Sequence, residues 1–181
     1  MKPLSTPAAG CEHPLELLDA CHERILRFAE MIPKIGRHVA AKGVDGEVRQ
    51  AALGVIRYFD DAGARHHVDE EKDLFPALLR CTPPPQLAAL QQLLRRLRQD
   101  HEELEALWSA MRVRLQRLAD GTEAQLDAYA AEAFVEHYHR HIALEEAELL
   151  PLAHRVLDAA AVAAVGASMA ARRGVVLKTA S

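Results

Sequence analysis

An internal repeat constrains the fold of this chain more than any other feature of its sequence. The motif His-x3-Glu-Glu-x2-Leu-[Phe/Leu]-Pro occurs at residues 66–76 and again, 75 residues later, at residues 141–151. The segments before the two motifs also correspond, because His22-Glu23-Arg24-Ile25 matches His101-Glu102-Glu103-Leu104 with a slip of four residues. This period is longer than the repeat of a solenoid. It predicts two helical hairpins that close into one bundle.

Turn signals divide the sequence into five helical segments. The first is expected to begin at Pro14, to kink at Pro33 and Gly36, and to end at 42–46. The second is expected at 47–80, the third at 86–119, and the fourth from a Thr122 cap to Pro151. A shorter alanine-rich helix is expected at 153–171.

These segments predict an all-α fold, since no stretch shows the alternation typical of strands. Four long helices joined by short links favour an up-down-up-down four-helix bundle, with the shorter C-terminal helix beside it. We therefore divide the chain into an N-terminal arm (1–13), the bundle (14–152), and a C-terminal helix and tail (153–181).

Histidines and glutamates of the repeat are expected to meet inside this bundle. His66 and Glu70 are four residues apart, so they lie on one face of their helix, and so do His141 and Glu145. Counting residues from the helix ends places one histidine of each helix at depths that agree to within about 12 Å. The sequence therefore predicts that four imidazoles and two carboxylates converge on one layer of the core.

Such a layer predicts a metal site. Burying six polar groups costs several kcal/mol per charge unless each group finds a partner, and convergent histidine and glutamate side chains usually bind metal ions. With two ions, each glutamate can bridge both, and each ion takes two histidines. Mixed nitrogen and oxygen donors favour iron, with manganese or zinc as alternatives, and leave a position for a small ligand such as dioxygen or nitric oxide.

The ordered pattern resembles the hemerythrin-like family, which carries the HHE cation-binding domain. The resemblance extends from Pro14 to Pro151 and implies a four-helix bundle with a non-haem di-iron centre. By position, the resemblance implies six metal ligands, and these are His22, His66, Glu70, His101, His141 and Glu145.

Two departures separate this chain from the oxygen-carrying members of that family. The carriers have a His-x3-His pair on the third helix, whereas the corresponding positions here are Leu97 and Glu105. Their last motif is His-x4-Asp, whereas Glu145 follows His141 at the shorter spacing. The set of four histidines and two glutamates is closer to the bacterial branch that includes the repair-of-iron-centres proteins.

Several residues near the motifs each have two possible roles. We expect His67 at the surface, since it points about 100° away from its neighbour. His137 is either a further ligand or a hydrogen-bond partner, and Glu105 either approaches the metals or lies on an exposed face. Glu71 and Glu146 either contact the ligands or are solvated.

The leading functional hypothesis is a di-iron protein that binds or senses a small diatomic ligand, or handles iron in a stress response. One alternative is a di-iron oxidase or peroxidase of ferritin-like type, although only Glu136-x2-His139 fits its Glu-x2-His motif. Another is a helical interaction module with buried histidines and no metal. Whether the protein is an enzyme stays open.

Charge and apolar patterning limit the classes of partner and the compartment that we expect. With 22 basic and 26 acidic residues, the net charge of −4 argues against binding nucleic acid. The apolar stretch 159–165 is too short to cross a membrane, and the three cysteines form no CxxC pair, so we expect a cytoplasmic protein. A homodimer is left open, with Arg172 and Arg173 available for a second subunit.

Overall fold

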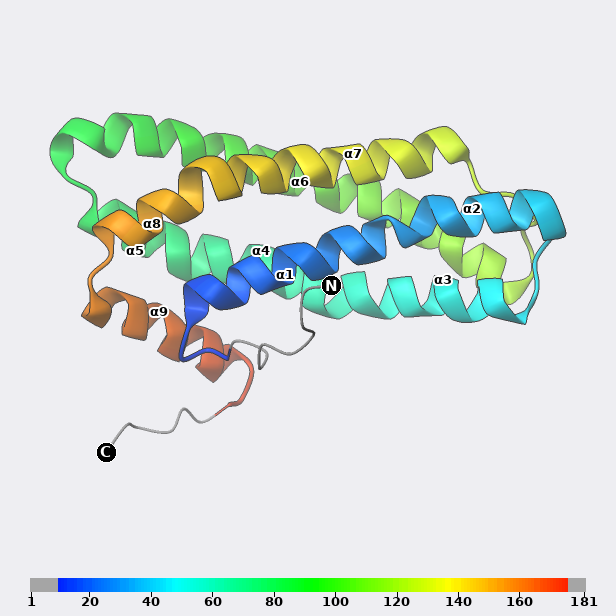
Figure 1. Cartoon of the computed structure of the whole chain (residues 1–181), viewed down its shortest axis with the longest axis horizontal. Helices are drawn as coiled ribbons and strands as arrows, with labels where there is room; N and C mark the ends of the chain where they lie inside the picture. Colours follow the sequence, from blue (N-terminus) through cyan, green and yellow to red (C-terminus); the bar gives the residue numbers. More distant parts are fainter. Residues whose placement is uncertain (1–9, 176–181) are drawn as a thin grey trace, which may run out of the picture.

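Four antiparallel helical rods form the body of the molecule (Figure 1). The computed structural model describes residues 10–175. The first rod is α1 (Pro14–Ala29) and α2 (Met31–Lys42), and the third is α6 (Pro84–Asp120). The second and fourth rods each combine α-helices with π-helical segments, labelled η. In chain order they are α3 (Gly46–Tyr58), η1 (Phe59–Gly63), α4 (Ala64–Asp69), η2 (Glu70–Leu74) and α5 (Phe75–Cys81), then α7 (Ala128–Leu144), η3 (Glu145–Leu149) and α8 (Leu150–Val156).

The all-α bundle predicted from the sequence is confirmed, and the described residues contain no strand. The additional C-terminal helix is α9 (Ala159–Arg172), which packs against α1 (Figure 1). Among residues 10–175, no single helix is both long and apolar enough to cross a bilayer. The segment 128–156 and α9 meet that threshold only as a pair bent by 119°.

The first rod breaks at a different residue from the one expected. The predicted kink at Pro33 and Gly36 is wrong in position, because α1 ends and α2 begins on either side of Glu30. This break places Pro33 in the first turn of α2, where its missing N–H leaves no helical hydrogen bond unmade. Gly36 continues the helix and lies beside Leu126.

The fourth rod also begins later than predicted. Thr122 does not cap it, because its hydroxyl donates instead to the Arg117 carbonyl at 3.3 Å and the chain runs on without helix. The cap of α7 is Asp127, whose carboxylate accepts from the Ala130 N–H at 3.1 Å. Asp127, five residues after Thr122, is the better cap and therefore decides where the helix starts.

Two π-helical segments recur at the period of the sequence repeat. η2 begins at Glu70 and η3 at Glu145, and in each the N–H five residues later bonds the glutamate carbonyl. Pro76 and Pro151 follow each segment closely. A proline inside an α-helix lacks a donor N–H and clashes with the carbonyl four residues earlier, so widening the helix just before it relieves the conflict.

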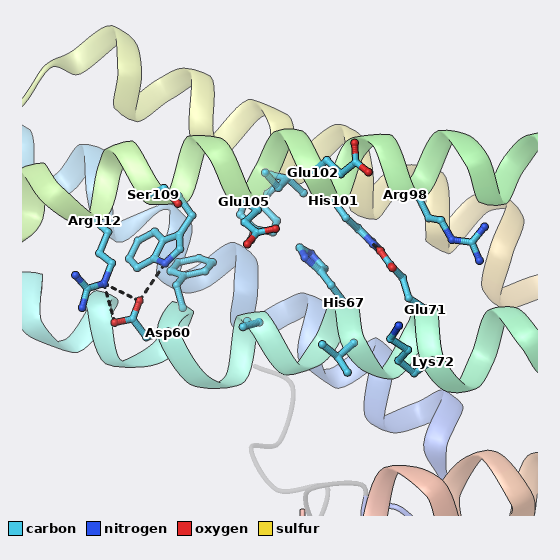
Figure 2. A pocket seen from close by; sticks show the side chains of 17 residues that line it. Asp60, His67, Glu71, Lys72, Arg98, His101, Glu102, Glu105, Ser109 and Arg112 are labelled. Atoms are coloured by element: carbon cyan, nitrogen blue, oxygen red, sulfur yellow. Dashed lines mark hydrogen bonds and ion pairs between the residues drawn. The ribbon is translucent and has the colours of Figure 1, made fainter. Parts of the chain in front are cut away.

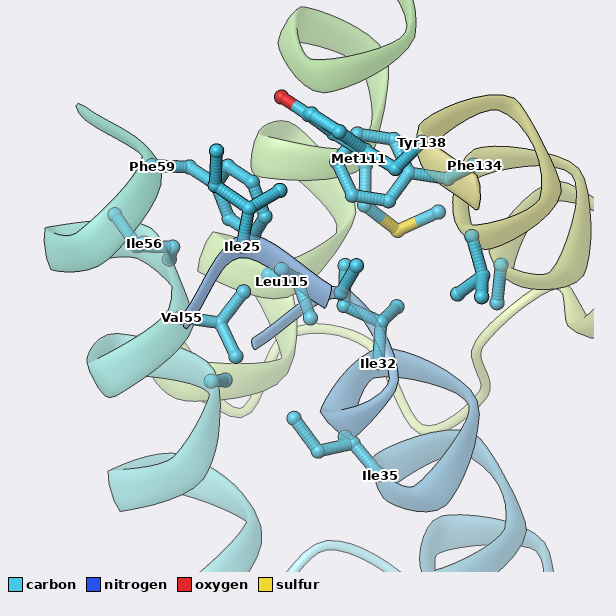
Figure 3. Close-up of a cluster of buried hydrophobic side chains, with 14 of the residues drawn as sticks. Ile25, Ile32, Ile35, Val55, Ile56, Phe59, Met111, Leu115, Phe134 and Tyr138 are labelled. Carbon is cyan, nitrogen blue, oxygen red and sulfur yellow. The ribbon is translucent and has the colours of Figure 1, made fainter. Parts of the chain in front are cut away.

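The apolar core is divided into two clusters. One lies towards α2, α3 and the C-terminal half of α6, and it contains Ile25, Phe59, Leu115, Phe134 and Tyr138 (Figure 3). The other lies towards α5, α8 and α9, and it contains Leu18, Leu74, Leu97 and Leu149. Along every rod, the residues predicted to bind metal lie between members of the two clusters. The fold therefore places a polar layer between two apolar ones.

α9 is attached to the second rod by ion pairs. Arg173 and Arg172 pair with Asp69, and Arg172 also pairs with Asp73. The hydroxyl of Ser168 donates to Asp73 at 2.6 Å. Both arginines that the sequence left available for a partner therefore bind carboxylates of their own chain.

Candidate metal centre

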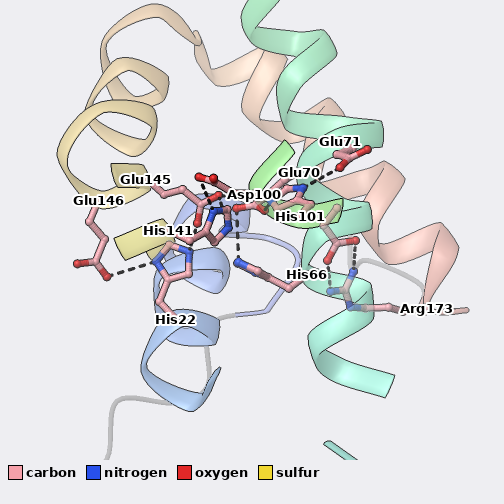
Figure 4. Close-up of polar contacts among 11 residues, drawn as sticks. His22, His66, Glu70, Glu71, Asp100, His101, His141, Glu145, Glu146 and Arg173 are labelled. Atoms are coloured by element: carbon pink, nitrogen blue, oxygen red, sulfur yellow. Dashed lines mark hydrogen bonds and ion pairs between the residues drawn. The ribbon is translucent and has the colours of Figure 1, made fainter. Parts of the chain in front are cut away.

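The six side chains predicted to bind metal lie together in the polar layer (Figure 4). Each rod contributes one imidazole, from α1, α4, α6 and α7, and the carboxylates come from the first residues of η2 and η3. All six residues are buried, with exposed fractions between 0 and 4 %. The convergence expected from counting residues along the helices is what the structure contains.

The donor atoms form two overlapping groups. One group contains His22, His66 and both glutamates, and the other contains His101, His141 and the same two glutamates. Within each group, one donor atom per residue lies within 4.8 Å of the others. Each half of the repeat thus supplies the imidazoles of one group, while Glu70 and Glu145 belong to both. Carboxylates shared in this way can bridge two ions.

The polar atoms that face one another in this layer have no hydrogen-bond partner among residues 10–175. The atoms that are buried and unpaired include Nε2 of each of the four imidazoles and both carboxylate oxygens of Glu70 and Glu145. Their nearest approaches to one another are long, such as 3.2 Å from His22 Nε2 to Glu145 Oε2 and 3.4 Å from His66 Nε2 to Glu70 Oε1. Leaving so many buried acceptors unpaired is costly. The donor set therefore fits metal ions, which bind lone pairs of this kind.

The second glutamate of each motif orients an imidazole from a different rod. Nδ1 of His101 lies 2.7 Å from Oε1 of Glu71, and Nδ1 of His22 lies 3.3 Å from Oε1 of Glu146 (Figure 4). An ionised carboxylate only accepts, so the imidazole donates from Nδ1. This fixes the tautomer whose Nε2 lone pair is free, and that lone pair faces the shared carboxylates.

The two buried glutamates do not ionise alike. Burial and the negative charge of Glu145 raise the pKa of Glu70 to about 8. Burial also acts to raise the pKa of Glu145, but the imidazoles of His141 and His101 outweigh it and lower that pKa well below its ordinary range. Because the carboxyl groups of Glu70 and Glu145 lie close together, only one of the two is expected to be ionised unless a cation binds between them.

The histidine pKa values divide according to their carboxylate neighbours. Burial lowers the pKa of His66 well below its ordinary value, and it also lowers that of His141. Burial opposes the charged form of His101 and His22 too, but Glu145 and its neighbours raise these pKa values to about 10 and about 8. Protons and metal cations therefore compete for the same nitrogen atoms.

The structure shows where the side chains with two possible roles lie. Glu71 and Glu146 contact the predicted ligands, as just described. Nε2 of His137 lies 3.3 Å from Oε2 of Glu103, and Glu105 lines a groove between α6 and the second rod. The expectation that His67 lies at the surface holds only in part, since its side chain is half-buried and its ring stacks on that of His101 with centroids 4.1 Å apart.

Two polar neighbours of the site were not predicted. Oδ2 of Asp100 lies 3.7 Å from Nδ1 of His141, and the buried Asp69 directly precedes Glu70. No motif identifies Asp100, because its counterpart before His22 is Cys21. Asp69 and Asp73 are spaced four residues apart, which places both on one helix face but does not show that the arginines of α9 lie opposite them.

Comparisons with known proteins agree with this geometry. The model of the hemerythrin HHE cation-binding domain matches residues 13–153. An uncharacterized protein of Haemophilus influenzae (strain ATCC 51907 / DSM 11121 / KW20 / Rd) is 33% identical over 167 residues, which are 92% of this chain and 94% of that protein. The family model covers all four rods and the six residues of the polar layer. This chain is a member of the hemerythrin HHE cation-binding domain family, and its four-helix bundle is a cation-binding domain.

Proposed function

We propose that this protein binds two iron ions in the polar layer and uses them to bind a small ligand such as dioxygen or nitric oxide. The observation that carries the proposal is the pair of overlapping donor groups, which share Glu70 and Glu145. One ion would be held by His22 and His66, and the other by His101 and His141. Both carboxylates would bridge the two ions.

The donor chemistry favours iron over harder or softer metals. Two imidazoles and two carboxylates per ion form a mixed nitrogen and oxygen set without thiolates, since all three cysteines lie outside both groups. Such a set suits iron, with manganese and zinc as the alternatives. Four protein donors leave further positions on an iron ion, and iron in this setting supplies reversible ligand binding or electron transfer.

The protein's own residues would prepare this site in two ways. Glu71 and Glu146 hold the imidazoles of His101 and His22 with Nε2 free for a metal. The two apolar clusters cover the layer on both sides and limit the access of water. A small molecule is therefore favoured over a bulky one as the exogenous ligand, and iron handling in a stress response is consistent with the same site.

The competing functions find less support in the arrangement. A helical interaction module without metal would leave the buried lone pairs of the layer unpaired. The Glu-x2-His motif of ferritin-like oxidases falls on Glu136 and His139, which are exposed on the outer face of α7. The oxidase alternative therefore has no donor set from that motif.

Anaerobic loading with ferrous iron, followed by addition of nitric oxide or air, tests the proposal. We expect new visible absorption bands in the wild type, and we expect the bands and the iron to be lost in His66→Ala and His141→Ala. His154→Ala, which changes an exposed histidine of α8, is the matched control. Persistent bands after air indicate binding, whereas steady consumption of oxygen indicates an oxidase. A folded wild type that takes up no iron contradicts the proposal.

A further inference from the structure

A groove of about 560 Å³ lies beside the polar layer (Figure 2). It runs between α6 and the second rod, at η1, α4 and the start of η2. Aromatic rings of Phe59, Trp108 and Tyr138 line one part of it, and charged side chains such as Lys72 and Arg98 line its rim. His67 and His101 are both among its lining residues, so the groove reaches one of the two donor groups.

His67 stands between the open part of the groove and that donor group. Figure 2 shows its ring rising from α4 towards α6, beside His101. The two rings are nearly parallel, at 11°, with centroids 4.1 Å apart. Nε2 of His67 is buried and has no hydrogen-bond partner among the described residues. An unpaired imidazole nitrogen in this place is costly unless it has a ligand.

The donor atoms of His67 also lie close to those of the second donor group. His67, His101 and His141 form a cluster in which one nitrogen of each lies within 4.8 Å of the others. The repeat has no equivalent on the other side, because the residue 75 positions after His67 is Ile142, a buried member of the apolar core. The two metal positions therefore differ in one available imidazole.

We propose that His67 is a fifth imidazole donor, which binds the ion held by His101 and His141 and is displaced by a ligand that enters through the groove. This inference rests on the proposed iron pair and adds to it a difference between the two ions, which follows from the presence of His67 in the first repeat and Ile142 in the second. The ion held by His22 and His66 receives no such donor. At the ion held by His101 and His141, an exogenous ligand would therefore compete with the His67 side chain.

The substitution that tests this inference is His67→Ile, which gives the first repeat the residue present in the second. His139→Ile, at an exposed position of α7, is the matched control, and circular dichroism establishes that both variants remain folded. The proteins are loaded anaerobically with ⁵⁷Fe²⁺. Mössbauer spectra then report the surroundings of each iron, and azide serves as the small anionic probe in an absorption titration.

We expect one of the two Mössbauer doublets to change in His67→Ile while the other stays as in the wild type. Azide binding tightens by about tenfold or more if His67 occupies its position nine-tenths of the time, since the competing donor is gone. Loss of a single iron from folded His67→Ile also identifies His67 as a donor. Spectra and azide affinity equal to those of the wild type overturn the inference and leave the iron pair standing. A wild type without iron overturns both.

Discussion

Nδ1 of His101 lies 2.7 Å from Oε1 of Glu71, and this contact joins a histidine of α6 to the second rod. The repeat contains the same relationship between His22 of α1 and Glu146 of the fourth rod, at 3.3 Å. In both, the glutamate directly follows a shared carboxylate in the sequence. Each π-helical segment thus positions one carboxylate towards the proposed metal pair and the next towards a histidine that binds it.

Removing these orienting contacts is expected to weaken iron binding without abolishing it. Glu71→Ala should lower iron affinity by about 10–100-fold, because the His101 ring loses the acceptor that fixes its tautomer. Glu146→Ala should have a smaller effect, since its contact is longer and its side chain is more exposed. Titration against a competing chelator measures both. Glu132→Ala is the control, and a Glu71→Ala affinity equal to that of the control would argue against the orienting role.

The ion pairs of α9 are expected to contribute to stability. The carboxylate of Asp69 is 1% exposed, and Arg173 Nη1 donates to it at 3.0 Å. Arg173→Ala leaves this buried charge with only the weaker contact to Arg172, at 3.4 Å, so we expect a loss of about 1–3 kcal/mol in urea unfolding. Adding Asp69→Asn should restore part of the loss.

The control for this prediction is Arg95→Ala, which removes an exposed arginine of α6. If Arg173→Ala unfolds at the same urea concentration as Arg95→Ala, the ion pair does not stabilise the docking of α9.

Two glycines are expected to respond to alanine in opposite ways. A Cβ at Gly166 would lie 2.1 Å from the backbone oxygen of Cys11, so α9 would have to move away from the segment before α1, at a cost of about 1–3 kcal/mol. Nothing lies within 4 Å of a Cβ at Gly54 in α3, where alanine should add about 0.5–1 kcal/mol of helix stability. Thermal unfolding of both variants compares them. Equal melting temperatures would contradict the close approach.

The cap of α3 is expected to give a defined pH dependence. Asp45 accepts from the Val48 N–H at 2.9 Å and from His38 Nε2 at 2.7 Å, and these hydrogen bonds lower its pKa. Because folding lowers the pKa of Asp45, the stabilising effect of its ionised carboxylate is complete above the unfolded pKa of about 3.9. That effect is lost as the pH falls through the folded pKa.

The melting temperature of Asp45→Ala should therefore lie furthest below that of the wild type near neutral pH, and the two should approach each other below about pH 4. Circular dichroism melts over this range measure the difference. A difference that stays constant down to the onset of acid unfolding would show that the ionised cap is not its source.

The sequence predicted the bundle and the polar layer because both depend on periodic signals. Repeated His-x3-Glu spacing places His66 with Glu70 on one helix face, and the repeat itself requires a second such face at His141. Strong breaks such as 82–85 and Gly121, whose φ is 74°, then place the helix ends. These signals act locally, so they can be recognised without the structure.

What the sequence did not predict depends on contacts between elements. The partial burial of His67 was not predicted because the 100° step from His66 turns its ring towards α6, where it stacks on His101, and the sequence does not show that α6 lies there. Arg172 and Arg173 were left for a partner because nothing in the sequence brings α9 to Asp69. Thr122 was chosen as a cap because it directly follows the break at Gly121, whereas the better cap, Asp127, comes only after a longer link.

The iron count per chain, combined with electron paramagnetic resonance of the oxidised protein, tests the central proposal most directly. Shared carboxylates should couple two ferric ions, so we predict two irons per chain and no signal from isolated ferric iron. The same measurement on His66→Ala should show fewer than two irons, while His154→Ala retains both. One iron per wild-type chain with an isolated ferric signal, or a folded chain that binds none, would contradict a paired site built on Glu70 and Glu145.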